Sequence, residues 1–368
     1  MISEIAIKNF KVLKDVNLEF SALNILAGLN GSGKSSLIQA LLLLRQSFEK
    51  KDYNGLVLQG GNLLDLGSGK DIFYQYAGSD EQIKFMIKDE NGKSFIWKYS
   101  YESGSDILPG ILSPDQSSLE NLSLFTNGFQ YLNTEHISLS DTHLKSEYNV
   151  KNRNIGARGE FTAHYLAEYG ISERVKNIKL HHEAARSDSL IHQTDAWLGE
   201  ISPGVKLVAE DMANIGKVRL AFKFETKNGF TNEIKPGNTG FGISYVLPVV
   251  VAILKARKGD IVIVENPESH LHPKGQSVLG RMAACAAANG VQFIIETHSD
   301  HIINGIRVAV KKSILSALST KIFYFDRILE QDEQYSEIEE IKLDRNGELS
   351  CYPKGFLDEL NEQLMQLI

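Results

Sequence analysis

Eight residues near the amino terminus, Gly28-Leu-Asn-Gly-Ser-Gly-Lys34-Ser35, follow the spacing G-x-x-x-x-G-K-[ST]. A strand pattern precedes them at residues 23–27 and a helix pattern follows at 37–44, which is the context that a phosphate-binding loop requires. The backbone N–H groups of such a loop and the amino end of the helix point at one spot, which suits phosphate oxygens. Glycine is needed at Gly31 and Gly33, because a side chain would hold the backbone away from the phosphates or clash at positive φ.

The ligand that this loop predicts is ATP with Mg²⁺. Lys34 would reach the β- and γ-phosphates as a point charge, and the Ser35 hydroxyl would ligate the metal ion. The alternative is a glycine-rich turn with a chance lysine. The flanking strand and the buried helix count against that alternative.

A second group of chemical interest begins where the apolar run 261–264 ends in Glu265, followed by Asn266, Pro267 and Glu268. A buried strand that ends in an acid is how many phosphate-loop proteins hold Mg²⁺. An unpaired carboxylate would be costly to bury there, so a cation or a hydrogen-bond partner is implied. The alternative is a strand-end glutamate that faces solvent.

His298 follows another strand pattern, at residues 291–295, in the run Glu-Thr-His-Ser-Asp. The carboxyl ends of parallel strands form the edge where α/β proteins bind their ligands. A neutral imidazole at that edge could donate a hydrogen bond to the γ-phosphate or to the attacking water. The alternative is a histidine with a structural role.

A second glycine-rich stretch carries Gly240, Gly242 and Ser244 and comes directly before a helix pattern. Pro248 is tolerated only near the start of a helix, so this helix should begin within about one turn of Ser244. Its amino end is then a candidate anion site that the glycines allow a ligand to approach.

The elements that position these residues predict an α/β fold with a mixed sheet and covering helices. Alternation at residues 5–7 and 16–20 indicates an opening antiparallel hairpin. From residue 237 onward, helices near 243–256 and 273–288 alternate with the strands at 261–264 and 291–295. Such alternation is typical of a parallel sheet with helices on its faces.

The middle of the chain reads as an α+β insertion without repeats. Strands at 85–87 and 95–99 flank the turn signal Asn91-Gly92, and residues 160–168 and 195–201 are predicted helices. Sustained heptads are absent, which argues against a long coiled-coil arm. A tail follows with a strand near 322–325, a hairpin at Asn346-Gly347 and a final helix from about residue 357.

Composition narrows the class of protein. The chain has 368 residues, a net charge of -7 and two cysteines, Cys285 and Cys351. The charge argues against wholesale wrapping of nucleic acid, although a local basic groove is compatible with it. The two cysteines form no disulfide framework and fit a reducing compartment. No signal peptide is evident and the apolar run 245–254 is too short to span a bilayer, so we expect a cytoplasmic protein without a membrane partner.

Taken in chain order, these motifs resemble the ABC-type ATPases of the RecF, SMC and overcoming-lysogenization-defect group. Within that group the chain resembles compact AAA-family ATPases that end in a DUF3696 tail. The opening run IKNFKVLKDVNLEF is similar to the first hairpin of that family, and residues 352–358, YPKGFLD, are similar to its terminal motif. The resemblance covers roughly residues 1–75 and 236–360, and implies a P-loop NTPase fold of the ABC-ATPase type.

The resemblance also implies roles for individual residues. Glu265 takes the Walker B position, His298 is the switch histidine, and Gln59 is the Q-loop residue. Ser35, Glu265 and Gln59 would ligate the metal. The nucleotide-binding residues would be Asn30, Gly31, Ser32, Gly33, Lys34, Ser35 and Ser36 of the Walker A loop, with Gly240, Gly242 and Ser244 of the signature motif.

One departure from the family pattern concerns the catalytic base. Most ABC ATPases have an aspartate followed by the catalytic glutamate, whereas this chain has Glu265 followed by Asn266. An amide can orient water but cannot accept its proton. We therefore expect slow ATP hydrolysis with Glu265, Glu268 or His298 as the base.

Four segments are expected: residues 1–75 and 236–310 as the two parts of the ATPase domain, 76–235 as an insertion or lid, and 311–368 as the tail. The resemblance implies that the chain forms head-to-tail homodimers when it binds MgATP.

Two functions are compatible with these motifs. In the first, an ATP-driven switch recognises DNA or a phage signal, in DNA repair-like or phage defence processes, and acts on a partner effector such as a nuclease. In the second, the chain is itself a nuclease or toxin with a site in its middle region; a transporter ATPase fits less well.

Overall fold

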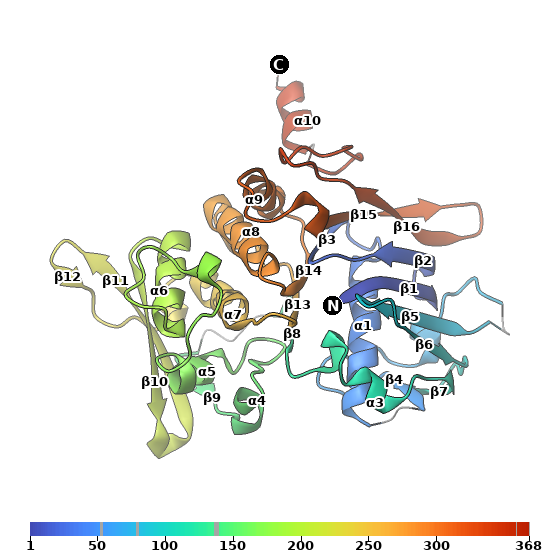
Figure 1. Cartoon of the computed structure of the whole chain (residues 1–368), viewed down its shortest axis with the longest axis horizontal. Coiled ribbons are helices and arrows are strands. Elements are labelled where there is room, and N and C mark those ends of the chain that lie inside the picture. Colours follow the sequence, from blue (N-terminus) through green and yellow to red (C-terminus); the bar gives the residue numbers. More distant parts are fainter. Residues whose placement is uncertain (52–53, 79–80, 136–139, 358, 368) are drawn as a thin grey trace. The chain divides into compact units, whose positions relative to one another are not determined.

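The computed structural model describes residues 1–51, 54–78, 81–135, 140–357 and 359–367. It forms two compact units, labelled by element in Figure 1. The first unit holds residues 1–126, 320–344 and 349–368, and the second holds 127–319 and 345–348. Asp358, the last residue of the predicted terminal motif, lies outside the described residues.

An antiparallel sheet makes up much of the first unit. Its opening hairpin is confirmed, with Ile5 opposite Leu18 and Ile7 opposite Val16. These four side chains are buried while the residues between them are more exposed, which is the pattern of a strand with one buried face. In spatial order the strands are β2 (Leu13–Glu19), β1 (Ile2–Phe10), β5 (Ile83–Asp89), β6 (Ser94–Tyr99), β7 (Ile107–Leu112) and β4 (Gly55–Val57).

The first unit also carries three strands of a mixed sheet. β3 (Leu23–Gly28) pairs in parallel with β15 (Thr320–Leu329), which pairs antiparallel with β16 (Gln334–Ile341). Helix α1 (Lys34–Glu49) follows β3 and packs against β1 and β3. Its side chains from Leu41 to Ser47 are all buried, as the sequence predicted for a helix that is apolar on nearly every face.

The short helices α2 (Gly69–Ile72) and α3 (Gln116–Leu119) also belong to the first unit, as does the final helix α10 (Glu359–Gln366). The predicted tail hairpin appears as an antiparallel bridge between Leu343 and Leu349.

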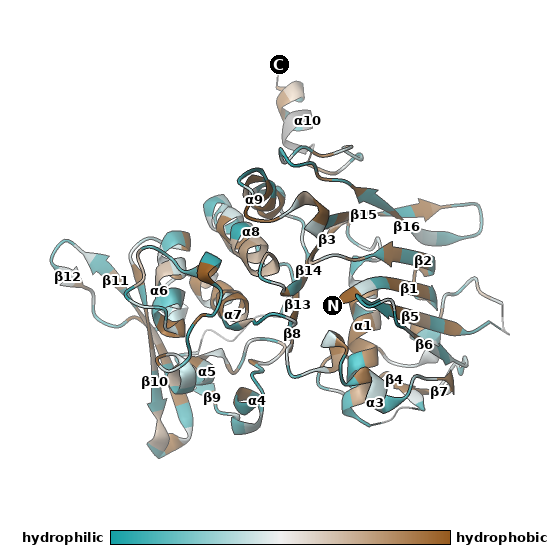
Figure 2. Cartoon of the chain, viewed as in Figure 1, coloured by the Kyte–Doolittle hydropathy of each residue, from teal (hydrophilic) through white to brown (hydrophobic). Residues whose placement is uncertain are grey.

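A parallel three-stranded sheet lies in the second unit, in the order β14 (Gln292–Glu296), β13 (Ile261–Glu265) and β8 (Phe129–Leu132). All of its residues except Glu265 are buried, which accounts for the continuous apolar runs in the sequence. The associated helices are α7 (Phe241–Lys255), α8 (Pro273–Ala287) and α9 (Asp300–Lys311). Figure 2 shows how strongly hydrophobic α7 is along its length.

The second unit contains an antiparallel sheet as well. β11 (Lys217–Thr226) pairs with β10 (Val205–Met212), β12 (Gly229–Phe230) and β9 (Thr142–Leu144). Helices α5 (Thr162–Tyr169) and α6 (Leu190–Ile201) pack against β10, and α4 (Glu147–Lys151) is a single short turn. The two helices predicted here are confirmed, although α6 begins five residues earlier than the predicted range.

Helix α7 contains a proline, as the helix predicted near residues 243–256 does. It begins at Phe241, within about one turn of Ser244 as expected, and continues through Pro248 to Lys255. A proline has no N–H to donate, so the carbonyl one turn earlier loses its helical partner. Burial of Val246, Leu247 and their neighbours on α7 offsets that loss.

None of the helices in the described part of the chain is both long and apolar enough to cross a bilayer.

Candidate functional site

The loop between β3 and α1 has the backbone that a phosphate site needs. Gly28, Gly31 and Gly33 have φ angles of 133°, 75° and 108°. A Cβ at Gly28 would lie 2.2 Å from the carbonyl oxygen of Phe325, and one at Gly33 would lie 2.2 Å from Ser336 Oγ. A Cβ at Gly31 would meet nothing within 4 Å. Glycine is therefore required by both space and φ at Gly28 and Gly33, and by φ alone at Gly31.

The amino end of α1 is open to an anion. Its N-cap is Gly33, which provides no side-chain hydrogen bond, and the first turn carries no acidic residue. The N–H groups of a first helical turn have no partner within the helix, and they carry the positive end of its dipole. A phosphate fits this position, so the loop is compatible with the nucleotide that the sequence predicted.

The side chains of the loop are held by its own carbonyl groups. Lys34 is buried, and its ammonium group donates to the carbonyl oxygens of Gly28 at 2.9 Å and Leu29 at 2.8 Å. Ser32 Oγ also donates to Leu29, at 2.8 Å. Ser336 on β16 donates to the Ser32 carbonyl at 2.5 Å and so fixes the loop from outside. The Lys34 ammonium is thus positioned at the loop, where a phosphate would replace these carbonyl partners.

The other predicted loop residues lie nearby on the same segment. Asn30 is exposed, whereas Ser35 and Ser36 are half-buried in the first turn of α1. Gln59 lies elsewhere in the first unit. It follows β4 of the antiparallel sheet, and its amide donates to the Gly67 carbonyl at 2.7 Å. Its predicted role as a metal ligand stays a prediction.

Glu265 ends β13 in a setting that favours its neutral form. It pairs in register with Glu296 at the end of β14, so two carboxyl groups meet at the edge of the parallel sheet. Burial, and then the charge of Glu296, raise the pKa of Glu265 to about 7. A hydrogen bond of 2.9 Å from Tyr131 on β8 acts in the opposite direction, because it stabilises the carboxylate. A cation bound here would restore the charged form, which suits a Mg²⁺ ligand.

The loop after β13 brings two other predicted residues together. Glu268 Oε1 accepts a hydrogen bond from the backbone N–H of His298 at 2.7 Å. The His298 side chain is exposed, directly before the Ser299 N-cap of α9. Glu268 therefore holds the segment that carries His298, in addition to its predicted role in assisting catalysis.

Asn266 contributes a strained backbone and a buried amide. Its φ is 45°, and its N–H donates to the Glu296 carbonyl at 2.9 Å. Its side-chain Oδ1 is buried and has no hydrogen-bond partner among the described residues. Buried polar atoms are nearly always satisfied, so this oxygen suits a donor such as a water molecule or a ligand group. An orienting role for the amide is consistent with this geometry.

The predicted signature residues lie at the amino end of α7, in the second unit. Gly240 is the N-cap with φ 85°, and a Cβ at Gly242 would lie 2.6 Å from the carbonyl oxygen of His270. Ser244 Oγ is buried and lacks a hydrogen-bond partner within the described part of the chain. The helix end and the loop that carries Glu268 are thus neighbours.

Two residues at this edge were missed by the sequence analysis. Glu296 could have been found, since it ends a strand as Glu265 does. Tyr131 could not, because the run Phe129–Leu132 reads as an ordinary apolar strand and only the sheet order places it beside β13.

The chain is similar in sequence to known proteins. A model of the family described as "AAA domain, putative AbiEii toxin, Type IV TA system" matches residues 23–304, and one described as "Protein of unknown function (DUF3696)" matches residues 315–367. A Helicobacter pylori protein (strain ATCC 700392 / 26695) named ATP/GTP phosphatase is 20% identical over 361 residues, covering 91% of this chain and 94% of its own.

Solved structures of SMC head domains are similar in fold. One, bound to the C-terminal winged-helix domain of ScpA, has a TM-score of 0.50 at 14% identity, covering 94% of this chain and 98% of its own. Another, from Thermotoga maritima, has a TM-score of 0.48 at 10% identity, covering 93% and 99%. The first supports the ABC-type fold that the motifs implied. The chain belongs to the AAA domain family named above, with a DUF3696 region at its carboxyl end, and it is a P-loop ATPase.

Proposed function

We propose that this chain is a MgATP-dependent switch that hydrolyses ATP slowly and passes its nucleotide state to a partner. The observation that carries the proposal is the loop before α1. It combines three glycines at positive φ, an uncapped helix end and a buried lysine whose ammonium group points into the loop. Each of these features favours a polyphosphate, and together they match the fold that the comparisons support.

The residues divide the chemistry among themselves. Lys34 and the loop N–H groups would bind the β- and γ-phosphates, while Ser35 would bind Mg²⁺. Glu265 would bind Mg²⁺ and the attacking water, and its raised pKa fits a group that must gain a cation to be fully charged. His298 would contact the γ-phosphate, with Glu268 holding its backbone. Gln59 is the remaining proposed metal ligand.

The direct test of this proposal is replacement of Lys34 by alanine. We expect ATP affinity to fall by roughly 100-fold or more, because a buried charge-assisted contact to phosphate is removed. Fluorescence titration with a labelled ATP analogue measures this. The matched control is Lys11→Ala, which removes another lysine of the first unit that donates to Gln39 outside the loop. An unchanged affinity in Lys34→Ala would refute the proposal.

Dimerisation is the finer part of the proposal. Gly240, Gly242 and Ser244 at the start of α7 would complete the nucleotide site of a second copy, arranged head to tail. A helix end contributes only about 0.3–2 kcal/mol to an anion, too little to hold a dimer alone. Two such ends with a modest interface would make the dimer depend on bound ATP.

The dimer is tested with Glu265→Gln, which should bind ATP without hydrolysing it. We expect its mass in solution to double on addition of MgATP and to remain that of a monomer without it. Light scattering after size-exclusion chromatography measures this. A monomer under both conditions would contradict the dimer while leaving nucleotide binding intact.

The partner is proposed to be an effector such as a nuclease, with DNA or a phage-derived signal as the trigger, in the cytoplasm. The support is the family description, which names a toxin of a toxin–antitoxin system. The competing reading, a nuclease or toxin site in the middle of the chain, lacks a supporting observation: among the described residues no group of three or more His, Cys, Asp or Glu could hold a metal ion. Plasmid cleavage by the pure protein with Mn²⁺ would favour that reading instead.

A further inference from the structure

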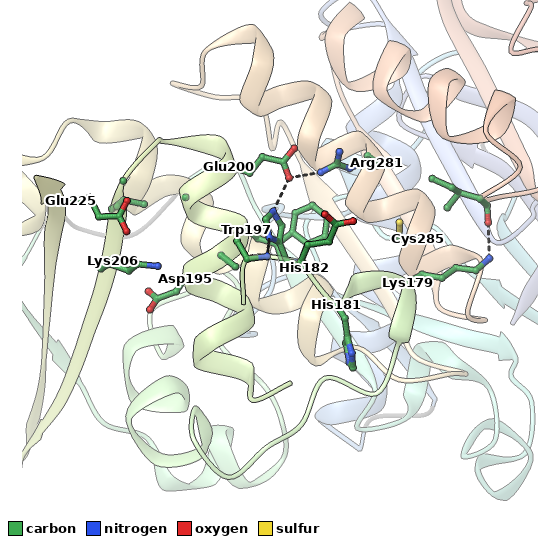
Figure 3. A pocket seen from close by; sticks show the side chains of 17 residues that line it. Lys179, His181, His182, Asp195, Trp197, Glu200, Lys206, Glu225, Arg281 and Cys285 are labelled. Carbon is green, nitrogen blue, oxygen red and sulfur yellow. Dashed lines mark hydrogen bonds and ion pairs between the residues drawn. The ribbon is translucent and has the colours of Figure 1, made fainter. Parts of the chain in front are cut away.

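A cavity of about 700 Å³ lies in the second unit and shares no lining residue with the candidate nucleotide site. It is bordered by α6, by the segment before α6, by the start of β10 and by α8 (Figure 3). Its volume falls within the range of small-molecule sites. The ATPase chemistry proposed above gives this cavity no role.

The charged side chains that line it are not balanced. Four are carboxylates (Glu183, Asp195, Glu200 and Glu225) and three are cations (Lys179, Lys206 and Arg281). Glu200 is paired with Arg281 and with His182. Glu183, Asp195 and Glu225 form no ion pair with any described residue. Lys179 donates to the carbonyl oxygen of Ile314 at 2.8 Å, a neutral partner that leaves its positive charge in place.

Asp195 is the most buried of the three carboxylates that have no ion-pair partner among the described residues. Burial raises its pKa, and the backbone hydrogen bond from Leu207, followed by the charge of Lys206, offsets only part of that effect. Its Oδ1 accepts a hydrogen bond from the Leu207 backbone N–H at 2.7 Å. Desolvating a carboxylate without a cation costs free energy that a bound cation would recover.

One wall of the cavity is rigid and aromatic. The Trp197 indole donates to the Leu180 carbonyl at 2.8 Å, and the Arg281 guanidinium lies 5.0 Å from its ring centroid. Figure 3 shows His182 and Arg281 both directed at Glu200 beside this ring. His182 Nε2 lies 3.1 Å from Glu200, which holds the wall in place. The wall therefore already binds one cation over an aromatic face.

We propose that this cavity binds a small organic cation with two or three amine groups, of the linear polyamine class. Asp195 and Glu225 would accept the ammonium groups, with Glu183 as the third carboxylate. The cavity also contains Lys206, which would compete with a single amine. Several amines on one chain overcome that competition, because each further carboxylate contact forms at a high effective concentration.

Isothermal titration of the full chain with spermidine tests this proposal. Asp195→Asn is the informative variant, since an asparagine Oδ1 can still accept from the Leu207 N–H while the charge is lost. Asp211→Asn is the matched control. It removes one charge from β10, the strand that also carries Lys206, at a residue that pairs with Lys145 outside the cavity. Both variants change the net charge equally, so general attraction of a polyamine to an acidic protein affects them alike.

We expect spermidine to bind the wild type, and Asp195→Asn to weaken it roughly tenfold. Asp211→Asn should stay within about twofold of wild type. Glu225→Gln, at an exposed position, should weaken binding as well and guards against a folding defect in the first variant. Glutamate, an anionic probe, should not bind.

Three results would overturn the proposal. These are no binding of spermidine by the wild type, equal losses in Asp195→Asn and Asp211→Asn, or tighter binding of a lysine-rich peptide that Asp195→Asn does not weaken. Because ATP affinity is measured separately with Lys34→Ala, failure here leaves the proposed ATPase role untouched.

Discussion

The phosphate loop of the first unit and the carboxyl edge of the parallel sheet in the second unit are built in different ways. The loop is fixed by local backbone: three closely spaced glycines at positive φ, a helix end and one lysine. The edge is fixed by partners that are distant in sequence. Glu265 depends on Glu296, 31 residues further on by the numbering, and on Tyr131, which lies 134 residues away. A motif can specify the first kind of site, whereas only a sheet can assemble the second.

Among these variants, Glu265→Gln is expected to have the largest effect, because it should lower kcat through the sheet edge while the phosphate loop still binds ATP. We expect kcat to fall on the order of 100-fold or more, because the metal-binding and water-orienting carboxylate is lost. ATP affinity should change only a few-fold, since the loop is intact. A coupled-enzyme ATPase assay and a binding titration measure the two quantities. Equal losses in both would mean that the edge binds ATP as strongly as the loop does.

The next effect concerns the loop alone and compares Gly33→Ala with Gly31→Ala. Both place a side chain at positive φ, which costs about 1–2 kcal/mol. Only Gly33→Ala also brings a Cβ to 2.2 Å from Ser336 Oγ, which adds about 1–3 kcal/mol of crowding. Chemical denaturation measures the free energy of unfolding.

The double variant Gly33→Ala with Ser336→Ala is the control, because it removes the atom at 2.2 Å and leaves the φ penalty with the milder contacts to Val12 Cγ2 at 3.1 Å and to the Cβ of residue 336 at 3.2 Å. Its stability relative to Ser336→Ala should approach that of Gly31→Ala relative to wild type. If Gly33→Ala and Gly31→Ala lowered the free energy of unfolding equally, the positive φ alone would account for the loss at both positions.

The same contrast explains what the sequence could predict. The loop, the strand before it and the buried α1 were all predictable, because spacing and periodicity act over a few residues. So was the position of Glu265 at a strand end. The role of Tyr131, which donates a hydrogen bond to Glu265, could not be predicted. It depends on β8 lying beside β13, and the sequences of these two strands do not reveal their order in the sheet. The helix that contains Pro248 was predictable as well, because the apolar pattern of residues 243–256 outweighs the local cost of the proline.

A smaller effect, on the edge, is expected from Tyr131→Phe. The pKa of Glu265 in the free protein is about 7, so kcat/KM, which reports pKa values of the free protein, should fall as the pH drops through that value. Tyr131 donates to the charged form, so losing its hydroxyl raises the pKa further. The acid limb of the kcat/KM profile should therefore shift to higher pH, by less than about one unit, with a loss of a few-fold at pH 7.

The control for Tyr131→Phe is Tyr165→Phe, which removes another buried hydroxyl of the second unit, one that donates to Glu173. It should leave the pH profile in place. A shift toward lower pH in Tyr131→Phe would show that hydrolysis needs the protonated form of Glu265.

The smallest effect on stability is expected from Ser244→Ala. The Ser244 hydroxyl is buried, and its oxygen lacks a hydrogen-bond partner in the described part of the chain, so removing it deletes no interaction within the fold. We expect the free energy of unfolding to change by less than about 0.5 kcal/mol, or to rise, because an unsatisfied polar group is removed.

The same substitution should strongly weaken ATP-dependent dimerisation when it is made in the Glu265→Gln background. If the Ser244 hydroxyl is dispensable for folding but required for association, its role is to bind the nucleotide held by a second copy. If dimerisation survived, the amino end of α7 would have to act through its backbone N–H groups alone.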